Sequence, residues 1–109
     1  MKDDRLYLIH IKECIERIES YLGDADKKEF INSTLLQDAL IRNLQVLAES
    51  TQCLSDKIKE SRQDIEWYRI AGFRNILVHN YLGLDLETVW NIVVNDLPTL
   101  SKAVEEMLR

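Results

Sequence analysis

An arginine, a histidine and a tyrosine lie close together in residues 74–81, whose sequence is RNILVHNY. Imidazole titrates near neutral pH, so His79 can act as a general base or acid. The guanidinium of Arg74 can hold a phosphate through two parallel hydrogen bonds and stabilise negative charge on it. These groups suit phosphoryl transfer within RNA, in which a base deprotonates a ribose 2′-OH and the oxygen attacks the adjacent phosphorus.

Helical geometry limits how these side chains can meet. At 100° per residue Arg74 and His79 differ by 140°, whereas Asn75 and His79 differ by 40°. Convergence on one small ligand therefore needs the arginine to bend around the helix or a second subunit to complete the cleft. The spacing favours a site at an interface. A structural interpretation stays open, because a histidine near a helix C-terminus is stabilised by the helix dipole and a surface arginine is often only solvated.

Apolar residues at intervals of three and four predict the helices that carry this segment. Leu8, Ile11, Ile15 and Ile18 form such a stripe, which predicts a first helix over residues 4–22 followed by Gly23 at its end. A short helical turn capped by Asp26 is expected next. The sequence of residues 34–37, TLLQ, matches a capping box and predicts a second helix over residues 34–54.

Two further helices follow a charged connector at residues 55–64. The third is expected to run to Tyr81 or Leu82 with Gly83 just past its end, and the fourth is expected to begin after Asp85. Pro98 lies inside the fourth pattern and predicts a kink or break there. The fold class is therefore all-α, an antiparallel up-and-down four-helix bundle.

Composition restricts the class of protein. A chain of 109 residues with 46% hydrophobic residues, 3 Gly and 1 Pro suits a single domain over residues 1–109 and excludes a disordered or loop-rich chain. Its apolar runs are far shorter than the ~20 residues that span a bilayer, and its N-terminus has no apolar leader, so we expect a cytoplasmic protein without a membrane segment. Cys14 and Cys53 fit neither a disulfide framework nor a zinc site, and no metal or other cofactor is expected.

Charge is unevenly distributed along the chain. The formal net charge of −5 argues against an indiscriminate nucleic-acid binder. Residues 57–74 are the exception, because they hold five basic and three acidic residues. An anionic ligand is therefore expected to meet the protein in this segment, although a solvated surface of mixed charge explains the same count. The five cations are Lys57, Lys59, Arg62, Arg69 and Arg74.

The ordered set of motifs resembles the HEPN-domain RNases, and in particular the HepT toxin family. Arg74, His79 and Tyr81 match the R-x4-H-x-Y motif of that family without departure. Residues 38–44 (DALIRNL) resemble its polar second helix, and residues 67–75 (WYRIAGFRN) resemble its approach to the active site. Residues 81–85 (YLGLD) with Val89 and Trp90 resemble the segment that follows the site. The resemblance covers nearly the whole chain.

The resemblance implies a HEPN-like homodimer whose two motifs face each other across a cleft, and metal-independent cleavage of RNA. It also implies a type VII-like toxin–antitoxin pair, in which an MntA-type nucleotidyltransferase neutralises the toxin by transferring AMP to the motif tyrosine, here Tyr81. Arg74 and His79 are then the catalytic residues. The candidate contacts to the cleft or to RNA are Asn75, Asn80, Arg69, Asp38, Arg42 and Asn43.

Two other functions stay open at this point. The chain could be a non-catalytic helical adaptor that binds a nucleotidyltransferase or a nucleotide through Arg74 and His79. It could also be a structural dimerisation module.

Overall fold

A computed structural model describes the backbone of residues 2–79 and 85–109, and the side chains of residues 3–74 and 85–109. Within those residues every regular element is helical. The elements are α1 (Lys2–Leu22), α2 (Lys27–Ile31), α3 (Thr34–Gln52), α4 (Asp56–Glu60), α5 (Trp67–His79), α6 (Leu86–Asn91), the π-helical turn η1 (Ile92–Asp96) and α7 (Leu97–Leu108).

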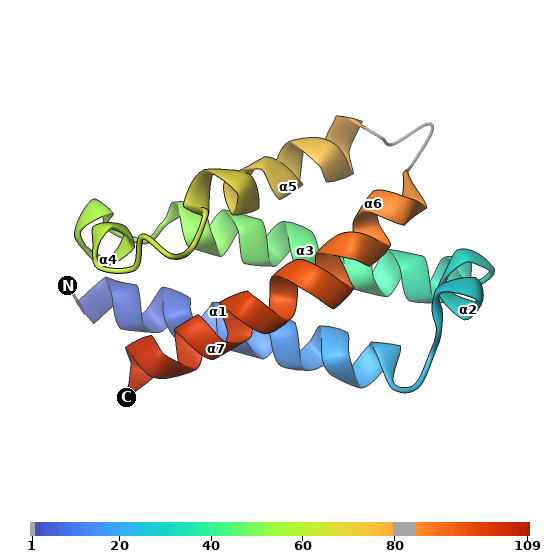
Figure 1. The fold of residues 1–109 in the computed structure, drawn as a ribbon, viewed down its shortest axis with the longest axis horizontal. Helices are drawn as coiled ribbons and strands as arrows, with labels where there is room; N and C mark the ends of the chain where they lie inside the picture. Colours follow the sequence, from blue (N-terminus) through green and yellow to red (C-terminus); the bar gives the residue numbers. More distant parts are fainter. Residues whose placement is uncertain (1, 80–84) are drawn as a thin grey trace.

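The long helices run back and forth along the longest axis of the molecule (Figure 1). Helix α3 packs against both α1 and α5, and α7 packs against α1. The short α2 contacts α3 and α6 at one end of the bundle. This arrangement confirms the expected all-α helical bundle.

The predicted apolar stripes form the core. Along α1, Leu8, Ile11, Ile15 and Ile18 are each at most 2% exposed. Burial of such side chains is the main favourable term in folding, at about 25 cal/mol for each Å² of apolar surface removed from water. The facing helices complete the core with Leu40, Leu44, Leu47, Leu97, Leu100 and Val104.

Helix α3 begins at Thr34, as the predicted range 34–54 has it, but its N-cap lies one residue before the predicted one. Ser33, in extended backbone conformation, is the N-cap, and its hydroxyl accepts a hydrogen bond from the Leu36 backbone N–H. Thr34 is therefore already helical and exposed. Gln37 does not close a capping box, because its amide donates to the carbonyls of Phe30 and Ile31. The prediction of Thr34 as the cap was wrong, since Ser33 offers the same chemistry one residue earlier.

The predicted connector at residues 55–64 contains a helix that the periodicity did not indicate. Ser55 caps α4 by accepting from the Ile58 backbone N–H, and its own N–H and hydroxyl donate to the carboxylate of Asp4 at 2.8 and 2.6 Å. Asp4 is only 8% exposed. These hydrogen bonds lower the pKa of Asp4 and tie the start of α4 to the first turn of α1.

The last helix accommodates Pro98 through a change of helical type. The Leu97 N–H donates to the carbonyl of Ile92, five residues earlier, which is the π-helical spacing. Pro98 then falls in the first turn of α7, where its missing N–H removes no α-helical bond. The predicted interruption is therefore a π-turn that ends at Asp96, two residues before the proline. The predicted caps Asp26 and Asp85 are confirmed for α2 and α6.

Candidate functional site

Helix α5 carries both proposed catalytic residues. Its thirteen residues, Trp67–His79, include Arg74 in the sixth to last position and His79 at the end. Five residues of α-helix separate the two by about 7.5 Å along the axis. Arg74 is exposed, while Phe73 beside it is 1% exposed and anchors α5 to the core.

Part of the motif lies outside what the structure describes. Asn75 and His79 belong to the α5 backbone, without a description of their side chains. Asn80 and Tyr81 lie outside the described residues, as does Gly83, the predicted end of the third helix. Helix α6 begins directly after this segment, with the Asp85 carboxylate accepting from the Thr88 N–H at 3.2 Å and from its hydroxyl at 2.6 Å.

The polar residues predicted on the second helix lie on α3, which packs against α5. Asp38 and Arg42 are exposed. Asn43 is half-buried, and its amide donates to the Ala39 carbonyl at 2.9 Å. The amide of Asn43 is therefore paired with the backbone of its own helix.

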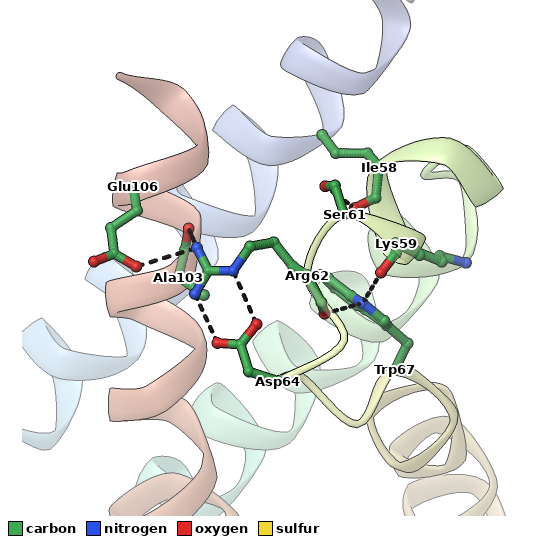
Figure 2. A network of polar contacts seen from close by, with 8 residues as sticks. All are labelled: Ile58, Lys59, Ser61, Arg62, Asp64, Trp67, Ala103 and Glu106. Carbon is green, nitrogen blue, oxygen red and sulfur yellow. Dashed lines mark hydrogen bonds and ion pairs between the residues drawn. The ribbon is translucent and has the colours of Figure 1, made fainter.

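Arg62 joins the segment before α5 to α7 (Figure 2). Its Nε and Nη2 donate to the two carboxylate oxygens of Asp64 at 2.9 and 2.8 Å, and its Nη1 lies 3.1 Å from Glu106 and 3.4 Å from the Ala103 carbonyl oxygen. This paired arginine lowers the pKa of Asp64, and the two carboxylates raise the pKa of Arg62. The Arg62 guanidinium therefore holds the α4–α5 connection in place.

The same connection is fixed from the other side by Trp67. Its indole N–H donates to the carbonyls of Lys59 and Arg62, both at 3.1 Å (Figure 2). Because Trp67 is the first residue of α5, these bonds set where the helix that carries Arg74 and His79 begins.

Arg69 is a second arginine of residues 57–74 that forms an ion pair. Its Nη2 lies 3.2 Å from Oδ2 of Asp96, the last residue of η1. The pair borders a shallow hollow of about 140 Å³ between α5 and the start of α7, whose lining also includes Asp64 and Glu66. Arg69 was predicted as a phosphate contact, and the structure places an acidic partner beside it that the sequence pattern did not indicate.

These ion pairs reduce the positive charge that residues 57–74 present at the surface. Arg62 and Arg69 are each neutralised by carboxylates of this chain. Lys57, Lys59 and Arg74 are the remaining cations of the segment. The count of charges therefore overstated how much positive charge this segment presents to a ligand.

The described residues contain no group of three or more His, Cys, Asp or Glu side chains arranged to hold a metal ion. Cys14 is buried and Cys53 is exposed, and both thiols are free. Among the same residues no helix is long and apolar enough to cross a membrane.

A family profile described as "Ribonuclease HepT-like" matches residues 11–107. The chain belongs to the HepT-like ribonuclease family. The matched residues include both α5 and the segment with Tyr81, so the resemblance drawn from the motif is confirmed. No solved structure matches this HepT-like chain significantly.

Individual relatives are similar over nearly the whole chain. A Methanocaldococcus jannaschii protein named "Gamma-glutamylcyclotransferase and putative RNase" is 36% identical over 98% of this chain, which spans 48% of that protein. A second protein of that organism, named "Putative RNase", is 33% identical over 95% of each chain. The "mRNA nuclease HepT" of Shewanella oneidensis is 27% identical over 87% of this chain and 88% of its own. The HepT-like chain thus spans about half of the first relative and most of the other two.

Proposed function

We propose that this HepT-like chain is a metal-independent endoribonuclease and the toxin of a toxin–antitoxin pair. The observation that carries the proposal is the family match over residues 11–107, which contain Arg74, His79 and Tyr81 in the order R-x4-H-x-Y. The exposed position of Arg74 on α5 and the name "mRNA nuclease HepT" of one relative support it.

The proposed reaction uses the chain's own side chains. His79 takes the proton from a ribose 2′-OH, the oxygen attacks the adjacent phosphorus, and the bond to the 5′-oxygen of the next nucleotide breaks while that oxygen takes up a proton from the protonated imidazole or from water. Arg74 stabilises the charge that develops on the phosphoryl oxygens. The products are a 2′,3′-cyclic phosphate and a 5′-hydroxyl, and no step needs a divalent ion.

A homodimer is part of this proposal. On a regular helix Arg74 and His79 are 140° apart, so either the arginine bends around the helix or a partner subunit completes the site, and the proposal takes the second arrangement. Each copy then contributes an α5 to a shared cleft. RNA enters this cleft, while the acidic remainder of the surface repels it.

We also propose that an MntA-type nucleotidyltransferase neutralises the toxin by transferring AMP to Tyr81. The hydroxyl oxygen of Tyr81 attacks the α-phosphorus of ATP and pyrophosphate leaves. The added phosphate and nucleoside then lie two residues from His79 in the chain, where they compete with an RNA phosphate for Arg74.

Substitutions in α5 with matched controls test the catalytic assignment. His79→Ala and Arg74→Ala should each abolish RNA cleavage and toxicity while helicity and dimer mass stay unchanged. His10→Ala and Arg17→Ala remove the same side-chain types from exposed positions on α1 and should leave cleavage unchanged. If His79→Ala cleaves RNA and remains as toxic as the unmodified chain, the non-catalytic adaptor explains the chain better.

Mass spectrometry tests the modification. The chain without substitutions, incubated with an MntA-type enzyme and ATP, should gain the mass of AMP, and Tyr81→Phe should not. Tyr7→Phe removes a hydroxyl from α1 and is the matched control, which should still be modified. An equal gain of AMP mass in Tyr81→Phe, or no gain in the chain without substitutions, contradicts the regulatory assignment.

A further inference from the structure

We propose that Asp96 limits the affinity of this chain for RNA by competing with an RNA phosphate for Arg69. This inference rests on the proposed function, since it takes single-stranded RNA as the ligand of α5. It assigns a specificity-determining role to Asp96, whose carboxylate comes from the π-turn η1 rather than from α5.

The exposure of the pair leaves Arg69 accessible to a second anion. Its side chain is 55% exposed, whereas that of Asp96 is 25% exposed and held at the start of α7. A single contact joins them, between Nη2 and Oδ2 at 3.2 Å. Exposed ion pairs of this kind contribute little to stability, so a phosphate can replace the carboxylate without unfolding the protein.

Arg62, in the same segment, is paired more extensively than Arg69 and has a structural role. It is 23% exposed and contacts both oxygens of Asp64, one oxygen of Glu106 and the Ala103 carbonyl. Displacing Glu106 and Ala103 would break the contacts of this arginine with α7. Of the two paired arginines, Arg69 is therefore the one that RNA can reach.

Arg69 and Arg74 lie on different sides of α5. Arg69 lies five residues before Arg74, about 7.5 Å along the helix axis and 140° around it, so a strand that contacts both must curve around the helix. The hollow beside Arg69 is lined partly by apolar residues and includes three acidic ones, Asp64, Glu66 and Asp96. An RNA backbone therefore gains the Arg69 contact only by overcoming the charge of Asp96, which disfavours RNA that binds through few other contacts.

Binding of a 2′-O-methyl oligonucleotide tests this inference, because the probe keeps its phosphates but lacks the hydroxyl needed for cleavage. Fluorescence anisotropy of the labelled strand should give a lower Kd for Asp96→Asn than for the unmodified chain at 50 mM salt. One added phosphate contact on a single strand steepens the dependence of log K on log salt by about 0.7. The advantage of Asp96→Asn should then shrink about 2.6-fold between 50 and 200 mM salt, because 4 raised to the power 0.7 is about 2.6.

Two further variants separate a specific effect from a general one. Asp64→Asn removes the same charge and also breaks an ion pair with an arginine. Because Arg62 keeps Glu106 and Ala103 as partners, the Kd and salt slope of Asp64→Asn should change less than those of Asp96→Asn. The double variant Arg69→Ala/Asp96→Asn should lose the gain in affinity. Equal gains in Asp96→Asn and Asp64→Asn, a gain that persists without Arg69, or an unchanged salt slope would each overturn the inference.

Cleavage of unmodified RNA distinguishes failure of this inference from failure of the proposed function. If the unmodified chain cleaves RNA and Asp96→Asn binds the probe no more tightly, only the role of Asp96 is wrong. If Asp96→Asn shows the predicted binding and the chain cleaves no RNA, the nuclease assignment is wrong and the RNA contact stands.

Discussion

Replacing Asp4 by alanine should destabilise the helical bundle, because Asp4 joins α1 to the start of α4. Its carboxylate accepts two hydrogen bonds from Ser55, at 2.8 Å from the backbone N–H and at 2.6 Å from the hydroxyl. The Ser55 hydroxyl in turn caps α4. Without Asp4, two half-buried donors lose their acceptor and the capping hydroxyl loses the group that orients it.

The expected loss follows from these contacts. Hydrogen bonds to a charged group contribute about 1.5–3 kcal/mol, and partial access of water to Ser55 offsets part of the cost, so Asp4→Ala should lose about 2 kcal/mol. For a domain of this size, that corresponds to a Tm lower by about 8 °C. Urea denaturation followed by circular dichroism at 222 nm measures the free energy of unfolding directly.

Asp3→Ala provides the matched control. Asp3 also carries a negative charge in the first turn of α1, but it is exposed. Both variants lose a similar favourable interaction with the helix dipole, so the difference between them isolates the bonds to Ser55. Equal free energies of unfolding for the two variants at pH 7 would refute the reasoning.

The dependence on pH gives an independent check. The bonds to Ser55 lower the pKa of Asp4 in the folded chain, so its stabilising effect is fully present above the unfolded pKa of about 3.9. The effect is lost as the pH falls through the lower folded pKa. The deficit of Asp4→Ala should therefore stay constant from pH 7 to pH 5 and shrink below about pH 4. A deficit that is as large at pH 2.5 as at pH 7 contradicts the assignment.

Three further predictions concern packing, assembly and chemistry. Phe30→Ala should cost about 3–5 kcal/mol in urea denaturation, because Phe30 is fully buried with its ring 5.6 Å from that of Trp90, whereas the adjacent Ile31→Ala, 41% exposed, should cost much less. Light scattering at micromolar concentration should give twice the mass of the chain, and a monomer would contradict the shared cleft. RNA cleavage should survive EDTA and leave 2′,3′-cyclic phosphates, whereas loss of cleavage on chelation, or products with 5′-phosphates, would contradict the mechanism.

Most of the helical framework could be predicted because long apolar stripes carry a strong periodic signal. The stripe from Leu8 to Ile18 specifies which face of α1 is buried, and Asp26 and Asp85 mark where α2 and α6 begin. Helix α4 was not predicted because its five residues are too few to show the helical period of apolar residues. The shift from Thr34 to Ser33 shows a related limit, since two adjacent hydroxyl residues offer the same capping group and only the backbone conformation separates them.

The sequence motif nominates groups for the candidate site, but it does not show how the charges of the neighbouring arginines are balanced. The motif itself singled out Arg74 and His79, since a few residues of helix suffice to relate them. The partner of Arg69 lies 27 residues away, at the end of the π-turn η1. Pairing across helices depends on packing. A count of lysines and arginines along the chain therefore gives the formal positive charge, not the part of it that carboxylates leave for a ligand. For this chain the difference decides whether Arg69 adds fully to the attraction of residues 57–74 for RNA or, as we infer, only where a phosphate can displace Asp96.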